Sequence, residues 1–172
     1  SRCTNLTSFN FSGISNIGDY AFAYCKNLPS IKIPGSVDFI GNNTFEECTS
    51  LKSVSLSTSL EKIPLGTFSE CSSLAKIDIP NSVIEIDDYA FLSCTSLTKV
   101  TLPKSLKVIG QNAFQGCASL TEINIPDTIE RIGKEAFSLN ITEATPGTVL
   151  QFAFSNGNVP NIEIGGTGSY YV

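Results

Sequence analysis

Residues 90–112 read AFLSCTSLTKVTLPKSLKVIGQN, and this stretch decides the fold because its pattern returns every 23 residues along the chain. Phenylalanine occupies one position of the repeat, at Phe22, Phe45, Phe68, Phe91, Phe114 and Phe137. Cysteine follows three residues later, at Cys25, Cys48, Cys71, Cys94 and Cys117. Several residue types that keep one common period indicate a repeat architecture.

Each repeat also contains two apolar residues separated by one outward residue. These pairs are Ile31/Ile33, Val54/Leu56, Ile77/Ile79, Val100/Leu102 and Ile123/Ile125. β-Branched residues with a period of two predict a short strand in each repeat. A proline follows four of the five pairs, and proline is tolerated there because the hydrogen-bonded ladder ends.

The block between two strands, I-G-x-x-A-F-x-x-C in the consensus, is too short for a full helix. Its apolar spacing of about three predicts a helical or 3₁₀ turn that points Phe and Cys inward. One strand and one such turn per repeat predict an α/β repeat protein, a right-handed solenoid. A parallel β-sheet covers one face, its strands about 4.8 Å apart, and short helical or 3₁₀ turns cover the other. Equivalent side chains, such as Phe45, Phe68 and Phe91, should then form columns inside the rod.

The repeat also predicts the boundaries of the domains. Residues 1–139 hold the repeats, with a degenerate first coil over 1–17 followed by five regular coils, and residues 140–172 form a degenerate C-terminal coil or cap. Asn140 stands where a sixth cysteine is expected, Ala153-Phe154 resembles the A-F block, and residues 159–164 resemble a strand block. Because the chain opens without Met, we expect a mature or excised segment with any signal peptide outside it.

The composition argues against several classes of function. The chain has 172 residues, a formal net charge of −5 and no His, which removes the Ser-His-Asp and Cys-His mechanisms and the commonest metal ligand. No C-x-x-C motif supports a zinc or thioredoxin-type site. We therefore predict no enzyme activity and no catalytic, cofactor-binding or metal-binding residues. The negative charge argues against a nucleic-acid partner, and no apolar run reaches the roughly 18 residues of a membrane span.

The cysteines allow two interpretations. Six cysteines in an extracellular chain suggest disulfides, but stacked equivalent positions carry parallel Cβ vectors, which disfavours bridges between coils. Buried free thiols that act as small apolar fillers are therefore the favoured prediction. Cys3 is the least constrained cysteine and the one best placed to react or pair.

Two pairs of adjacent carboxylates, Glu46-Glu47 and Asp87-Asp88, could suggest acid–base chemistry on a polysaccharide. Such a mechanism needs two carboxyl groups that face each other across a cleft. Adjacent residues on a repeat turn are more typical of a solvated face. A polysaccharide-acting enzyme therefore stays a remote alternative.

The repeat resembles the BspA-like family of leucine-rich repeats over roughly residues 3–139, with a weaker echo to 164. The A-F-x-x-C block at 90–94, the strand block at 97–103 and the S-x-x-x-I-G block at 105–110 carry this resemblance. The chain departs from the common leucine-rich pattern, because no Asn or Cys follows the strand at the usual offset. The resemblance implies a leucine-rich-repeat solenoid and a non-enzymatic recognition module. It further implies an adhesin-like protein, at the cell surface or secreted, that binds host-matrix or cell-surface protein or glycan.

The outward residues of the predicted sheet are the candidate partner-binding face. Inward and outward side chains alternate along a strand, so residues beside the apolar pairs point to solvent. The face comprises Ser30, Lys32, Lys52, Ser53, Ser55, Lys76, Asp78, Lys99, Thr101, Glu122 and Asn124. Repeat proteins use such continuous surfaces for binding, and Lys52, Lys76 and Lys99 form a basic stripe that could attract an acidic partner. The alternatives are a plain soluble face, and a structural spacer or stalk that associates end to end.

Overall fold

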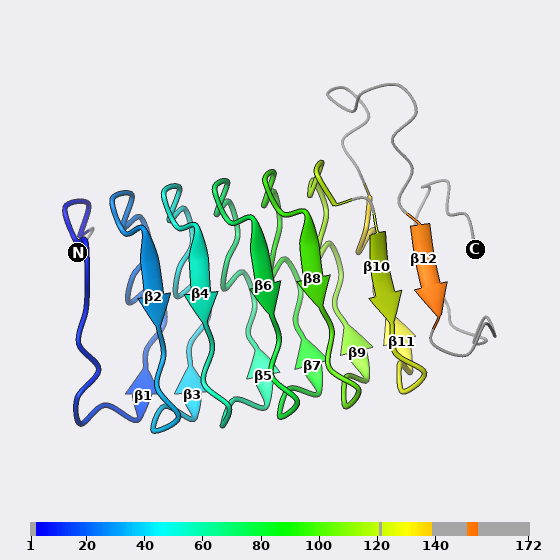
Figure 1. Cartoon of the computed structure of the whole chain (residues 1–172), viewed down its shortest axis with the longest axis horizontal. Helices are drawn as coiled ribbons and strands as arrows, with labels where there is room; N and C mark the ends of the chain where they lie inside the picture. Colours follow the sequence, from blue (N-terminus) through cyan, green and yellow to red (C-terminus); the bar gives the residue numbers. More distant parts are fainter. Residues whose placement is uncertain (1–2, 121, 139–150, 155–172) are drawn as a thin grey trace.

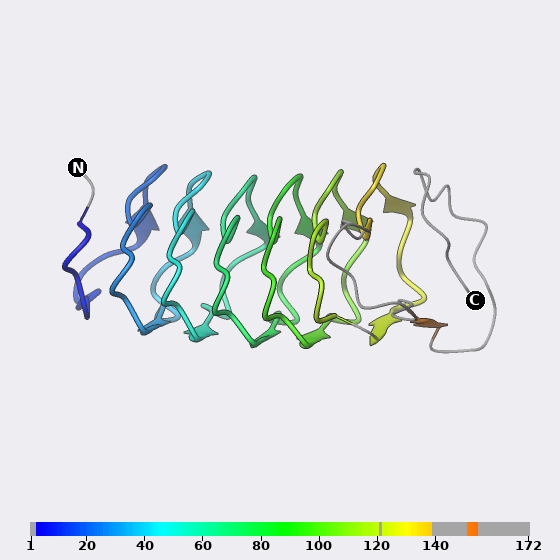
Figure 2. The same cartoon turned by 90° about the horizontal axis from the view of Figure 1, so that it is seen from above.

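The computed structural model describes residues 3–120, 122–138 and 151–154, and its strands wind into a regular solenoid (Figure 1). One row contains β2 (Ser30–Lys32), β4 (Ser53–Ser55), β6 (Lys76–Asp78), β8 (Lys99–Thr101) and β10 (Glu122–Ile125). A second row contains β1 (Asn16–Ile17), β3 (Phe39–Ile40), β5 (Lys62–Ile63), β7 (Glu85–Ile86), β9 (Val108–Ile109) and β11 (Arg131–Ile132). The chain descends along the first row and returns along the second as it advances, which makes a right-handed coil (Figures 1 and 2).

The strand pairing confirms that one 23-residue repeat makes one coil. All pairs are parallel, and partners such as Ser30 and Ser53, or Lys76 and Lys99, are one repeat apart. In the first row β2 pairs with β4, and β6 pairs with β8, while β4 lies next to β6. In the second row β5, β7, β9 and β11 form one continuous sheet.

The core is a set of columns that run the length of the rod, as the sequence predicts. The rings of Phe45 and Phe68 stack with centroids 5.5 Å apart and an interplanar angle of 3°. The next two steps, Phe68–Phe91 and Phe91–Phe114, measure 5.4 Å and 5.0 Å. At the N-terminal end Phe9 meets Phe22 edge-on at 5.0 Å. The near-parallel stacks show that the ring of this repeat position keeps its orientation from coil to coil.

The five repeat cysteines are buried beside this column, and Cys3 is exposed. From the second coil onward each thiol donates a hydrogen bond to the carbonyl of the phenylalanine in the preceding coil. The pairs are Cys48 Sγ to Phe22 O at 3.1 Å, Cys71 Sγ to Phe45 O at 3.2 Å, Cys94 Sγ to Phe68 O at 3.1 Å and Cys117 Sγ to Phe91 O at 3.2 Å. All six cysteines are free thiols, and the predicted burial of the repeat cysteines is confirmed.

The predicted helical or 3₁₀ face is wrong, because the described residues contain neither kind of helix. The I-G-x-x-A-F-x-x-C block forms consecutive turns in which two residues have left-handed backbone, for example Asn43 (φ 52°) and Glu47 (φ 51°). A left-handed residue ends any right-handed helical run. Alternate N–H groups therefore point out of the turn and donate hydrogen bonds to carbonyl oxygens of the next coil. These bonds run from Asn43 to Leu65, from Phe45 to Thr67 and from Glu47 to Ser69, with N···O distances of 2.8–2.9 Å.

The second row of strands was not predicted either. Its strands are two residues long, and each shows only one buried side chain, such as Ile40 or Ile86. One apolar residue cannot show an alternation, so periodicity gives no signal there.

The C-terminal region differs from its sequence-based interpretation at one point. β12 (Gln151–Phe154) is a strand that pairs with β10, with Asn124 opposite Ala153. Ala153 and Phe154 therefore do not form an A-F turn block. Asn140 and residues 159–164, on which the rest of that interpretation depends, lie outside the described residues.

Candidate binding face

The outward side chains of the first strand row form the surface that the sequence singled out, here called the lysine face. The structure places ten of the predicted residues there with exposed side chains: Ser30, Lys32, Lys52, Ser53, Ser55, Lys76, Asp78, Lys99, Thr101 and Asn124. Glu122, the eleventh, begins β10. The burial pattern of β2, β6 and β8 is exposed–buried–exposed, as period-two alternation requires.

The strand register brings these residues together in rows across the strands. Lys32 lies opposite Ser55, and Asp78 lies opposite Thr101. Lys76 lies directly opposite Lys99, a like-charge pair that destabilises a sheet. The register therefore aligns the predicted residues of β2 with those of β4, and those of β6 with those of β8, and their role in binding stays a prediction.

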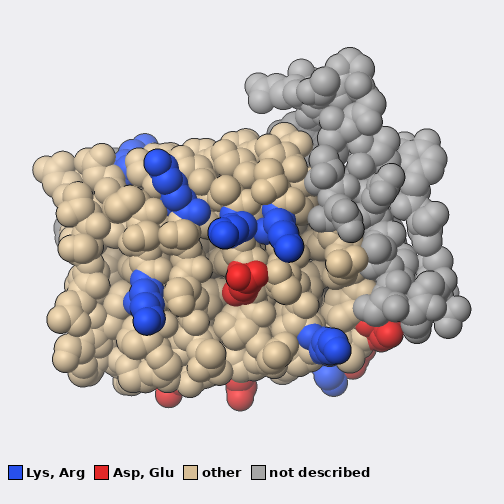
Figure 3. All heavy atoms as spheres, viewed as in Figure 1, with Lys and Arg blue, Asp and Glu red and all other residues tan. Residues whose placement is uncertain are grey.

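The lysines of this face differ from four lysines elsewhere, Lys26, Lys62, Lys107 and Lys134, in how their charge is balanced. Near the second strand row Lys62 contacts Asp87 at 2.7 Å and Glu85 at 3.3 Å, and Lys107 contacts Glu130 at 3.2 Å. Within the described part of the chain, no ion pair involves Lys32, Lys52, Lys76 or Lys99. Figure 3 shows basic side chains spread over this face, with an acidic group between them. The lysine face therefore carries unbalanced positive charge on a protein of net charge −5.

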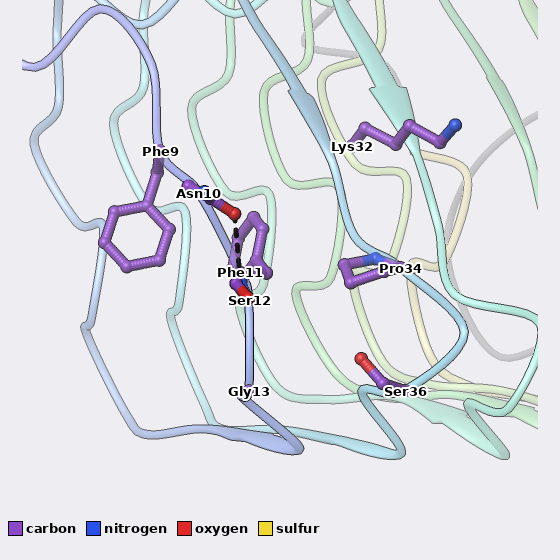
Figure 4. Close-up of a pocket in the computed structure, with 8 residues that line it drawn as sticks. All are labelled: Phe9, Asn10, Phe11, Ser12, Gly13, Lys32, Pro34 and Ser36. Carbon is purple, nitrogen blue, oxygen red and sulfur yellow. Dashed lines mark hydrogen bonds between the residues drawn. The ribbon is translucent and has the colours of Figure 1, made fainter.

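Two shallow hollows of about 420 and 390 Å³ lie where the N-terminal coil meets β2, and sequence reasoning missed them. The first is lined by Phe9, Asn10, Phe11, Ser12, Gly13, Lys32, Pro34 and Ser36 (Figure 4). The second is lined by Thr7, Ser8, Phe9, Ser30, Ile31, Lys32, Ser53, Val54 and Ser55. Lys32 lines both, and Figure 4 shows its side chain extending away from residues 9–13.

The polar groups of the first hollow are held by backbone contacts. Asn10 Oδ1 accepts a hydrogen bond from the N–H of Ser12 at 3.0 Å (Figure 4). Ser36 Oγ donates to the carbonyl of Ile14 at 3.2 Å, which ties the two coils together below the hollow. No periodic signal marks the hollows, because they lie against the degenerate first coil.

The paired carboxylates are used in contacts between coils. Asp87 binds Lys62, and Asp88 Oδ1 accepts the N–H of Gln111 at 2.6 Å. Glu47 contacts Lys26 at 3.0 Å, and burial, followed by the charges of Glu47 and Glu70, raises the pKa of Glu46 above its ordinary value. The described residues contain no group of three or more His, Cys, Asp or Glu side chains that could hold a metal ion.

The buried thiols are poor nucleophiles. Burial raises the pKa of Cys48 and Cys117 to about 12, and it raises those of Cys71 and Cys94 well above 9.0. The thiolate is the reactive form, so these four thiols serve packing and hydrogen bonding. In the part of the chain that the structure describes, there is also no helix long and apolar enough to cross a membrane.

Comparison with known proteins agrees with this architecture. The chain is 35% identical to a leucine rich cell surface protein from Faecalibacterium prausnitzii, over 67% of this chain, with a TM-score of 0.64. It is 31% identical to a leucine-rich repeat protein from Bacteroides ovatus over 73% (TM-score 0.55), and 26% identical to one from Eubacterium ventriosum over 76% (TM-score 0.63). These matches cover 31%, 38% and 44% of the three relatives' own chains, so the chain spans less than half of each. Among curated proteins none matches the chain.

The family pattern itself is found in the sequence. The BspA type leucine rich repeat region matches residues 1–117 and 63–170, in six copies. These ranges include the strand pairs and the A-F-x-x-C blocks on which the solenoid depends. The chain therefore belongs to the BspA type leucine-rich repeat family.

Proposed function

We propose that the chain is a non-enzymatic recognition module of a surface or secreted adhesin-like protein, which binds an extracellular protein or glycan through the lysine face. The observation that carries the proposal is the arrangement of Lys76 and Lys99. They face each other in register, exposed and without a carboxylate partner in the described residues. An arrangement that destabilises the sheet is expected where a partner supplies the missing negative charge.

The family supports this proposal. Repeat proteins expose a continuous surface built from equivalent positions and use it for binding. The Faecalibacterium relative is described as a cell surface protein, which is the location proposed for this chain.

Charge reversal tests the assignment of the face. The double variant Lys76→Glu/Lys99→Glu should weaken binding to its partner at least about tenfold, because complementary charge is replaced by repulsion. Its thermal unfolding should stay close to that of the wild type, since both side chains are exposed. Binding is measured against a panel of purified extracellular matrix proteins and a glycan array.

A matched control is available near the second strand row. The variant Lys107→Glu/Lys134→Glu makes the same change in net charge, and both lysines lie outside the lysine face. Equal loss of binding in the two double variants would reject the assignment, as would unchanged binding in the first.

A second candidate, a stalk that associates end to end, is favoured by the N-terminal end of the rod. There a hollow of about 290 Å³ is lined mainly by apolar residues, including Leu6, Phe11 and Phe22, and the ring of Phe9 is 44% exposed. Sedimentation at increasing concentration separates the two candidates. A stalk should associate and lose this association in Phe9→Ser, whereas a recognition module should stay monomeric.

A further inference from the structure

We infer that the ligand of the lysine face is an anionic polysaccharide lying across the strands, along the long axis of the solenoid. This inference rests on the proposed function and names the chemistry of its partner. It follows from the spacing of the lysines, from their lack of carboxylate partners and from the groups that line the two hollows beside Lys32.

The lysines provide one positive charge per coil over four successive coils. Lys32 lies in β2, Lys52 directly before β4, Lys76 in β6 and Lys99 in β8. Neighbouring coils are about 4.8 Å apart, so the four coils span roughly 15 Å along the axis. A chain of acidic sugars that crosses the strands would place successive negative charges over successive coils.

The rest of the face offsets only part of this charge. Its two acidic residues are Asp78 in β6 and Glu122 at the start of β10, against four lysines. The four lysines of the opposite group, Lys26, Lys62, Lys107 and Lys134, each contact a carboxylate within 4 Å. These four lysines thus have carboxylate partners, whereas the four lysines of the lysine face have none among the described residues and stay available to a ligand.

The two hollows beside Lys32 fit sugar hydroxyls. Their polar lining consists of Ser and Thr hydroxyls, the Asn10 amide and the Lys32 ammonium. Among the described residues that line them there is no Asp or Glu. Hydroxyl and amide groups can both donate to and accept from sugar hydroxyls, and the absence of carboxylates there avoids repulsion of an acidic sugar. An acidic protein surface could pair with the lysines, but it would not supply the sugar hydroxyls that fit these hydroxyl-lined hollows.

The test is equilibrium binding of the wild-type chain to three polysaccharides. Polygalacturonate carries carboxylates, heparin carries sulfates, and dextran is neutral. We expect one or both anionic polymers to bind and dextran to fail. Raising the salt concentration should weaken the binding, since exposed charges are screened. Equal binding of dextran, or of a single-stranded DNA of the same length and charge, would overturn the inference, because charge or shape alone would then suffice.

Two fourfold variants with the same change in net charge localise the site. The variant Lys32→Ser/Lys52→Ser/Lys76→Ser/Lys99→Ser should weaken binding of the anionic polymer at least about tenfold. The variant Lys26→Ser/Lys62→Ser/Lys107→Ser/Lys134→Ser should change it less than about twofold, since those lysines already have carboxylate partners. Circular dichroism and thermal unfolding verify that both variants are folded.

The outcomes separate this inference from the proposed function. If neither anionic polymer binds, or if both fourfold variants lose binding equally, the polysaccharide assignment is wrong. The proposed function then still stands if a protein of the matrix panel binds and Lys76→Glu/Lys99→Glu weakens that binding.

Discussion

At the scale of single residues, the repeat cysteines join neighbouring coils without forming bridges. All five thiols are buried, and the four from Cys48 onward each donate a hydrogen bond to a phenylalanine carbonyl of the preceding coil at 3.1–3.2 Å. A free thiol is a small apolar filler with a weak donor, which suits a position that must pack and also satisfy a carbonyl. The sequence predicted the burial of these cysteines, because one period of 23 places them all in one column. It could not reveal the acceptor, which depends on the turn geometry.

These thiols predict a loss of stability at alkaline pH. Burial raises the pKa of Cys48 and Cys117 to about 12, from an ordinary value of 9.0 that the unfolded chain keeps. Below pH 9 both states hold the proton, so the thiols have no effect on the pH dependence. Between pH 9 and 12 only the unfolded state ionises, and each buried thiol should lower the free energy of unfolding by up to about 1.4 kcal/mol per pH unit.

Urea unfolding between pH 7 and 10.5 measures this slope, and Cys71→Ala/Cys94→Ala is the comparison. The variant should be less stable at every pH but should show a shallower alkaline decline, since two fewer thiols ionise on unfolding. An identical slope in both proteins would show that other groups cause the decline.

At the scale of elements, the strands were predictable and the turns were not. The I-x-I and V-x-L pairs alternate inward and outward, and this period identifies a strand directly. The turn block has a spacing of three that suits a 3₁₀ segment and a series of separate turns equally well. Its left-handed residues include Tyr20, Glu70 and Ser93, and glycine stands at equivalent positions only at Gly66 and Gly116, so the sequence marks the positive φ in only some coils. The outward rows of the candidate site were predictable from the same alternation. The ion pairs and the hollows were not, because they depend on how far and in which direction individual side chains extend.

Position 70 distinguishes these turns from the helix that the sequence predicted. Glu70 has a φ of 59°, and the equivalent position two coils later is Gly116 with a φ of 72°. We expect Glu70→Gly to be more stable than Glu70→Ala by about 1 kcal/mol, because only glycine adopts this conformation without a steric cost.

Gly116→Ala should lose a similar amount of stability, about 1 kcal/mol, which makes it the matched substitution in the reverse direction. In a helix the order at position 70 would be reversed, since glycine is about 1 kcal/mol worse than alanine there. Guanidinium unfolding of the three variants gives their order of stability. A Glu70→Ala variant that is more stable than Glu70→Gly would contradict the left-handed turn.

At the scale of the whole molecule, stability depends on contacts between adjacent coils. The phenylalanine column and both strand rows link each coil to its neighbours one repeat away. A solenoid of this kind behaves as a sum of coils and of interfaces between coils. Its length can therefore change by whole repeats while the register of the rest is preserved.

Removal of one whole coil tests this. Deletion of residues 64–86 removes 23 residues and joins Ile63 to Asp87, so that every column continues. We expect a folded protein with cooperative unfolding and a smaller denaturant m-value, because less surface is buried.

Deletion of residues 64–83, which removes 20, is the control. It shifts the remaining repeats out of register and should abolish cooperative unfolding, since inward residues turn outward. Similar behaviour of the two deletions would contradict the stacked-coil description.

The bonds that alternate turn N–H groups donate to the next coil, such as Phe22 to Thr44 and Phe45 to Thr67, run along the axis of the rod. A tensile force applied between the two ends therefore loads one inter-coil boundary at a time rather than shearing many bonds together. Each boundary that yields releases a coil of 23 residues, and the freed chain can extend by on the order of 75 Å. A solenoid built this way absorbs mechanical work in steps while its remaining coils stay intact.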